Sequence, residues 1–264
     1  MKKLYFILIL CLPLLVQAQS KITAPTGIWP ELQLNYGMSE EGVLFIRNGY
    51  RINTDENFND LEETGLWGNF ERVELSLGYE HMFTDHWRGG AIIRYAAENN
   101  PKTTFYSAFL RHNGTVKGLY FNKQLLFDFV SQKEEDLSGR FNLMGELGKR
   151  IPVGSKFISP SIKYEAMLRS DFGKEEEGAP VERTIDRSRL RLGLNFELTK
   201  SLRINPYFMR QTDYYYVLIP PVYDENNKLV EDGYRTKRNR ITPVFGLELK
   251  YSINFNPNTA SITY

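Results

Sequence analysis

The chain of 264 residues has 33 basic and 32 acidic side chains, so its formal net charge is only +1. This balance excludes the strongly basic surface that a nucleic-acid partner requires. The single cysteine is Cys11, close to the N-terminus. If the N-terminal segment is removed, no disulfide, thiolate metal site or cysteine nucleophile remains.

The N-terminus has the pattern of a cleavable export signal. Two lysines precede an apolar stretch at 4–16, and Val16-Gln17-Ala18 offers a cleavage site. An N-terminal anchor helix is the less favoured alternative, because polar residues follow the apolar stretch at once. We therefore predict a signal peptide at 1–18 and a single exported domain at 19–264.

The rest of the chain repeats one pattern, in which apolar and polar side chains alternate over a segment and a turn follows. In the clearest segment Leu190 and Leu192 alternate with Arg189 and Arg191. No segment has an apolar stripe at helical spacing, and no apolar run downstream of the signal is long enough for a transmembrane helix. The predicted strands, in chain order, are 28–37, 43–53, 71–83, 87–97, 103–112, 116–130, 140–151, 156–170, 187–198, 202–217 and 240–255.

The connections between these segments alternate between short turns and mostly long loops, as in outer-membrane barrels. The segments are also long enough for tilted strands, which need about 9–11 residues to cross a bilayer. We predict an all-β fold, an up-and-down antiparallel transmembrane β-barrel of about 10–12 strands. Because bacterial barrels usually have an even number of strands, either this count merges or misses one strand, or the tail at 259–264 pairs as a twelfth.

Some local features leave details of the strands open. Asn113-Gly114 predicts a hairpin turn. The fifth segment has bulky side chains on both parities, at Phe105-Tyr106 and Phe109-Leu110, so its two faces are undecided. Prolines inside strand segments remove a backbone donor, and we expect them at strand starts or bulges. These prolines are Pro160, Pro206 and Pro243.

The residue types on the polar parity indicate which face of the sheet contacts hydrocarbon. A soluble periplasmic barrel, which would turn its apolar face inward around a lipophilic ligand, is one alternative. The polar parity, however, combines charged residues with glycines, and small groups among long charged side chains suit a crowded lumen. We predict that the apolar face meets lipid and that the following residues face the lumen: Arg47, Arg51, Glu74, Glu80, Arg88, Arg94, Glu146, Glu165, Arg189, Arg191 and Glu248.

Three stretches carry a resemblance to a known family. They are 26–34 near the predicted mature start, the arginine-rich segment 187–194, and Asn239-Arg240-Ile241 before a Gly-Leu strand. The chain resembles an uncharacterised family of Gram-negative outer-membrane proteins, domain-of-unknown-function family 2490. The resemblance implies a barrel but no activity, so it assigns no functional residues. The terminal aromatic Tyr264 is similar to the recognition signal that ends outer-membrane barrels.

Catalytic and metal-binding patterns are weak. Barrel enzymes that cleave lipid use a His-x-Ser pair, and none of His81, His86 and His112 is followed by such a serine. Three scattered histidines without cysteine also lack metal-ligand spacing. The acidic runs at 134–136 and 175–177 are expected to be solvated loops rather than calcium sites. We predict no enzymatic activity, no cofactor and no metal.

The inward-facing arginines and glutamates are the most informative feature for function, because rings of charge set selectivity in pores. Paired charges could equally fill the lumen and close it. We therefore expect a narrow porin-like solute channel or a structural barrel in the cell outer membrane. A lipid-acting hydrolase barrel is an alternative. The expected partners are outer-membrane lipid, the barrel-assembly machinery during insertion and a small solute, and Tyr214-Tyr215-Tyr216 is expected in the interfacial aromatic belt.

Overall fold

The computed structural model describes residues 20–59, 61, 70–98, 102–133, 137–171 and 184–254. Over these ranges the chain is almost entirely strand, with one short 3₁₀ helix, η2 (Glu56–Phe58). No helix in them is long and apolar enough to cross a membrane. The predicted signal peptide, both acidic runs and the C-terminal tail lie outside the described residues.

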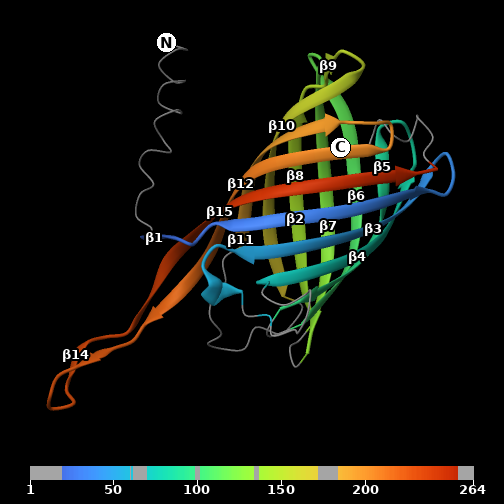
Figure 1. The fold of residues 1–264 in the computed structure, drawn as a ribbon. Helices are drawn as coiled ribbons and strands as arrows, with labels where there is room; N and C mark the ends of the chain where they lie inside the picture. Colours follow the sequence, from blue (N-terminus) through green and yellow to red (C-terminus); the bar gives the residue numbers. More distant parts are fainter. Residues whose placement is uncertain are drawn as a thin grey trace, which may run out of the picture.

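The long strands pair in chain order and close into a barrel (Figure 1). Neighbouring strands are antiparallel, except where β15 pairs in parallel with β2 and closes the barrel. The predicted all-β barrel is confirmed, and within the described residues its wall has eleven strands. These are β2 (Gly27–Gly37), β3 (Gly42–Asn53), β4 (Arg72–Met82), β5 (Trp87–Ala97), β6 (Thr103–Val116), β7 (Leu119–Gln132), β8 (Ser138–Gly148), β10 (Lys156–Asp171), β11 (Ile185–Glu197), β12 (Leu202–Ile219) and β15 (Tyr234–Ile253).

An odd number of strands explains the parallel closure. In an up-and-down barrel, the first and last strands run in the same direction when the number is odd. β1 (Ser20–Thr23) extends the line of β2 and also pairs in parallel with β15. The register shifts by one residue between them, since Thr23 faces Ile241 whereas Gly27 faces Val244. A further short strand, β9 (Ile151–Val153), pairs with β10 at the turn after β8.

The turn between β6 and β7 lies later than the Asn113-Gly114 dipeptide predicted. β6 continues through both residues, and the chain reverses at Lys117-Gly118. Both turn residues have positive φ, +50° and +79°, which matches a two-residue hairpin loop. The prediction was wrong because Gly118 also tolerates the left-handed backbone, and turning there extends the β6–β7 ladder.

The prolines lie inside strands, so the expectation of strand starts or bulges was wrong. Pro160, Pro206 and Pro243 all have a residue opposite them on a neighbouring strand. Opposite Pro206 the β11–β12 ladder is interrupted between Gly193 and Phe196. The register is the same on both sides of this gap. At Pro206 the strands therefore accommodate the missing backbone N–H by losing two residue pairs locally, without an inserted residue.

The apolar parity of the strands faces outward and the charged parity faces inward. Leu192 and Leu247 are 52% and 41% exposed. The side chains of their sequence neighbours Arg191 and Glu248 are only 13% and 9% exposed. A wall of exposed leucine, isoleucine, phenylalanine and tyrosine is compatible with hydrocarbon rather than water. The orientation contradicts the soluble-barrel alternative, in which the apolar face would be inside.

The structure also assigns the two faces of β6, which the sequence left undecided. Phe105 and Phe109 are buried inside the barrel, with 4% and 7% of their surface exposed. Tyr106 and Leu110 are exposed on the outer wall. Two large aromatic side chains therefore occupy the lumen beside the charged residues.

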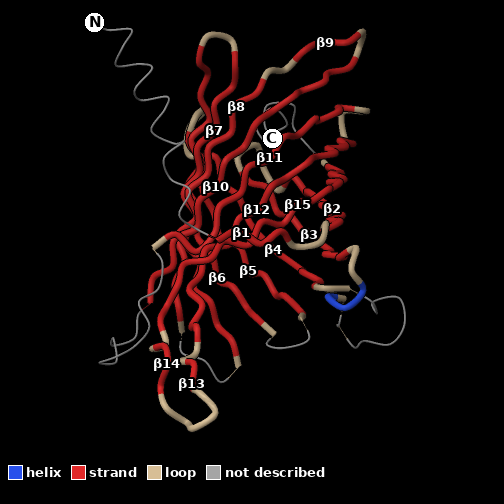
Figure 2. The backbone as a smooth tube through the Cα atoms, turned by 90° about the vertical axis from the view of Figure 1, so that its left-hand side faces the viewer, coloured by secondary structure: helices blue, strands red, loops and turns tan. Residues whose placement is uncertain are grey.

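β12 and β15 continue beyond the barrel as a long two-stranded arm (Figures 1 and 2). Their pairing extends to Ile219 opposite Tyr234. A small hairpin of β13 (Val222–Tyr223) and β14 (Leu229–Glu231) lies at its tip. The sequence predicted a loop at 218–239, so these strands are longer than expected. The arm begins after Asp213, where the pairing of β12 with β11 ends. The tyrosine run expected in the aromatic belt, Tyr214-Tyr215-Tyr216, follows directly and lies in β12 at the start of the arm.

Candidate functional site

The inner face of the barrel encloses a cavity of about 310 Å³, to which every strand of the wall contributes. Basic side chains outnumber acidic ones on its surface, eleven to five. The basic residues are Arg47, Arg51, Arg72, Arg94, Arg111, Arg140, Lys163, Arg187, Arg189, Arg191 and Lys250, and the acidic ones are Glu31, Glu74, Glu80, Glu165 and Glu248. The surface of the cavity is therefore cationic.

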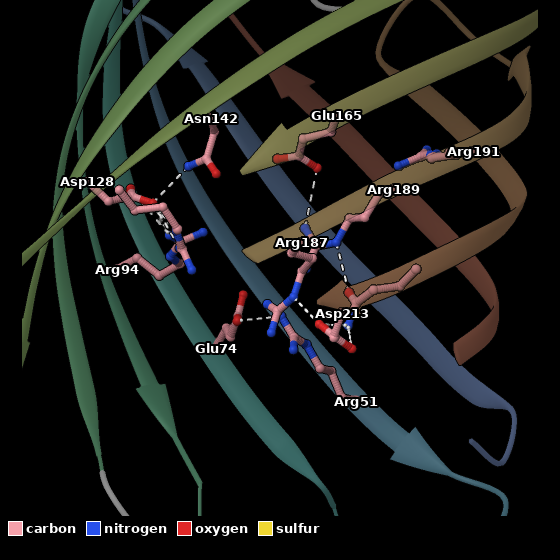
Figure 3. A network of polar contacts seen from close by, with 12 residues as sticks. Arg51, Glu74, Arg94, Asp128, Asn142, Glu165, Arg187, Arg189, Arg191 and Asp213 are labelled. Atoms are coloured by element: carbon pink, nitrogen blue, oxygen red, sulfur yellow. Dashed lines mark hydrogen bonds and ion pairs between the residues drawn. The ribbon is translucent and has the colours of Figure 1, made fainter. Parts of the chain in front are cut away.

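Asp128 on β7 is completely buried at the centre of one polar cluster (Figure 3). Its Oδ2 lies 2.8 Å from Arg140 Nη2 and 3.4 Å from Arg94 Nη2. Ser107 Oγ donates a hydrogen bond to Oδ1 at 2.5 Å, and Asn142 Nδ2 donates to Oδ2 at 2.9 Å. A buried carboxylate is tolerated only with this degree of compensation. The cluster connects β5, β6, β7 and β8 on the lumen side.

The same arrangement, in which two cations contact one carboxylate, recurs around the lumen. Glu74 Oε1 lies 3.1 Å from Arg51 Nη2 and 2.6 Å from Arg72 Nε. The other carboxylates that contact two cations are Glu80 (Arg88 at 3.0 Å and Arg111 at 3.1 Å), Asp213 (Arg187 at 2.5 Å and Arg240 at 3.6 Å) and Glu248 (Arg191, and Lys250 at 3.4 Å). Arg72 also pairs with Glu98, so the Glu74 group is neutral, whereas each of the other groups has one positive charge more than it has negative charges.

Aromatic rings hold several of these arginines from the other side. Several guanidinium groups lie over rings on the inner face, within the range of cation–π contacts. Three of these pairs, with the distance from the guanidinium carbon to the ring centroid, are Arg51 over Trp29 (4.3 Å), Arg94 over Phe105 (4.2 Å) and Arg191 over Tyr207 (3.7 Å). A guanidinium fixed between a carboxylate and a ring has little rotational freedom, so these charges have defined positions.

The structure places the predicted lumen residues together. Nine of the eleven line the cavity, and Arg88 and Glu146 are buried in the same wall. Three of the nine form one-to-one pairs: Arg47 lies 3.3 Å from Glu31, and Glu165 and Arg189 lie 3.4 Å from each other.

The list of predicted lumen residues omitted four residues at the centre of the network, Asp128, Arg140, Arg187 and Asp213. All four follow the same alternation as the predicted residues, so the pattern places them on the inner face as well. Asp128, for example, lies between two phenylalanines of the outer parity. Their ion-pair partners could not be found in this way, because those depend on the register of several strands.

The three histidines lie near the short turns, and none lines the cavity. His81 Nδ1 lies 3.3 Å from Tyr79 Oη, and the rings of His86 and His112 stack with centroids 6.0 Å apart. In the parts of the chain that the structure describes, none of them hydrogen-bonds a serine. Within the same residues no group of three or more histidine, cysteine, aspartate or glutamate side chains could hold a metal ion.

An apolar outer wall around a charged interior defines the class of the protein as a transmembrane β-barrel. Among solved structures, a NanC porin is similar with a TM-score of 0.43 and 12% identity, covering 86% of this chain and 97% of that chain. LpxR from Salmonella typhimurium is similar with a TM-score of 0.43 and 9% identity, covering 84% of this chain and 87% of that chain. No family model and no curated protein sequence matches the chain.

Proposed function

We propose that the protein is a narrow channel of the outer membrane that favours anionic solutes. The observation that carries the proposal is the excess of fixed positive charge, with two cations around each of five carboxylates. Low-dielectric walls focus the field of such charges into a cleft. The lumen should therefore concentrate anions and repel cations.

The fixed positions of the lumen charges favour an open channel rather than a lumen that its own side chains fill and close. Carboxylates and rings hold the guanidinium groups at fixed places on the wall. The cavity of about 310 Å³ leaves room for a small solute between them. An uncompensated cationic interior would also be a costly way to fill a structural barrel, because unpaired charge in a low-dielectric medium destabilises the fold.

The outer-membrane location rests on the combination of export pattern and fold. Bacterial outer membranes hold barrels whose apolar outer wall surrounds a polar interior. The lipid of that membrane would contact the exposed leucines and tyrosines of the wall, and the barrel-assembly machinery would insert the chain.

Recording the full chain in planar lipid bilayers under a potassium chloride gradient tests the proposal. We expect discrete conductance steps and a reversal potential displaced toward that of chloride. Lys250→Gln should reduce the anion preference, because Glu248 then has a single cationic partner. Lys123→Gln is the matched control, since Lys123 is exposed on the outer wall over Phe121.

Other results would contradict the anion channel. Cation preference would reject the role of the excess positive charge, and a folded barrel without conductance would indicate a structural protein. Absence of conductance together with breakdown of the bilayer lipid would favour the hydrolase alternative, so lipid products are measured in the same preparation.

A further inference from the structure

Lys163, on β10, differs from the other basic residues around the cavity. The other ten each lie within ion-pairing distance of a carboxylate. Lys163 lines the same cavity, yet in the described part of the chain no residue forms an ion pair or a hydrogen bond with its amine. Among the described basic residues that line the cavity, Lys163 is therefore the one whose positive charge is not balanced by a direct contact with the protein.

The neighbours of Lys163 across the sheet explain its isolation. Arg191 on β11 and Glu146 on β8 are directly opposite it. Arg191 already contacts Glu248, and Glu146 is farther from the Lys163 amine than the 4.0 Å of an ion pair. Glu165, two residues along the same strand and face, contacts Arg189. No nearby carboxylate in these strands is thus in direct contact with the amine.

We propose that Lys163 is the residue at which the lumen binds a small oxyanion, through a carboxylate or phosphate oxygen. This inference rests on the proposed function and names its binding site. A lysine ammonium has three donors and no acceptor, so an anionic oxygen in the cavity can form a short, charge-assisted hydrogen bond with it. The guanidinium of Arg191 on the adjacent strand adds positive potential at the same place. Glu146 opposes binding from the other side without blocking it.

Amine labelling of the unmodified protein tests the site directly. The full chain in phospholipid vesicles is treated with a small amine-acylating reagent, and the labelling of each lysine is measured by peptide mass spectrometry. Inorganic phosphate should slow the labelling of Lys163 several-fold relative to sodium chloride of equal ionic strength. Lys237, exposed on the arm, should be labelled at the same rate in both salts. Equal labelling of Lys163 in both salts would overturn the inference.

Variants give a second and independent measurement. Phosphate should block the chloride current of the unmodified channel. The block should disappear in Lys163→Gln, be retained in Lys163→Arg and strengthen in Glu146→Gln, which removes the opposing charge. Heat-dependent gel migration checks that each variant is folded, and Lys163→Arg preserves the charge if the glutamine variant does not fold.

The failure of the site and the failure of the channel are distinguishable. If the barrel does not conduct but phosphate still protects Lys163, the channel proposal fails and the binding site stands. If the barrel conducts anions and Lys163→Gln keeps the full phosphate block, the channel stands and Lys163 is not the site.

Discussion

Arg94 and Asp128 lie on β5 and β7, which are not neighbours in the sheet, and their side chains meet across β6 at 3.4 Å. Ser107, on the strand between them, donates a hydrogen bond to the same carboxylate. The lumen therefore adds side-chain connections between strands that share no backbone ladder. The lumen charges therefore stabilise the fold, in addition to any contact that they make with a solute.

Replacing Asp128 by asparagine should strongly destabilise the barrel. Arg94 and Arg140 would lose their shared carboxylate while they remain in the lumen, and breaking a buried ion pair typically costs about 3–5 kcal/mol. The free energy of unfolding, measured by urea titration in vesicles, checks the effect. Asp232→Asn, at an exposed position of the arm, is the control and should leave this value unchanged. A loss for Asp128→Asn as small as that of the control would refute the structural role of the cluster.

An arginine introduced on the outer wall should lower the free energy of unfolding, and the loss should increase with the depth of its position in the bilayer. Leu192 is near the middle of β11, and an arginine at the bilayer midplane of a barrel costs about 2–4 kcal/mol. Leu198, at the turn after the same strand, should tolerate arginine at a cost of about 0–1 kcal/mol. Both variants are compared by unfolding in vesicles. Equal costs would show that the outer wall does not face hydrocarbon.

Two lumen glycines should respond differently to alanine. A Cβ on Gly90 would lie 1.9 Å from the backbone oxygen of Tyr79, so Gly90→Ala forces adjacent strands apart. Overpacking of this kind typically costs about 1–3 kcal/mol. At Gly49 the nearest atom is Glu74 Cβ at 4.0 Å, and Gly49→Ala should be neutral or slightly stabilising. Thermal unfolding of both variants measures the difference, and a Gly49→Ala variant less stable than Gly90→Ala would contradict the packing.

The tip of the arm should be dispensable for the barrel. Ile219 and Tyr234 are directly opposite each other, so Asn-Gly can replace residues 220–233 as a two-residue hairpin loop. We expect the shortened protein to insert, to show the heat-modifiable migration of the full chain and to conduct with the same anion preference. Gel migration and bilayer recording check this. A change in selectivity would instead assign the arm a part in solute entry.

The fold and the orientation of its faces were predictable because they depend on a local pattern. Alternation with period two is visible at Leu190 and Leu192 without knowledge of any other strand, and so is the inward position of Arg191. The same rule places Asp128 on the inner parity, although the list of predicted lumen residues omitted it.

The network within the lumen was not predictable, because it depends on register. Arg51 on β3 contacts Glu74 on β4 only because these two strands are aligned in one particular register. The isolation of Lys163 depends on the alignment of three strands, and nothing next to it in the sequence distinguishes it from Lys250. The arm was also missed, since proline, glycine and charged residues near its tip gave 218–239 the composition of a loop.

The parallel pairing of β2 with β15 has a practical consequence for studies in intact cells. The described chain enters the wall at one rim, near Ser20, and leaves it at the other, near Asn254. Peptide tags fused at these two points would face different compartments. A membrane-impermeant antibody or protease would reach just one of them, which would fix the direction in which the protein is inserted.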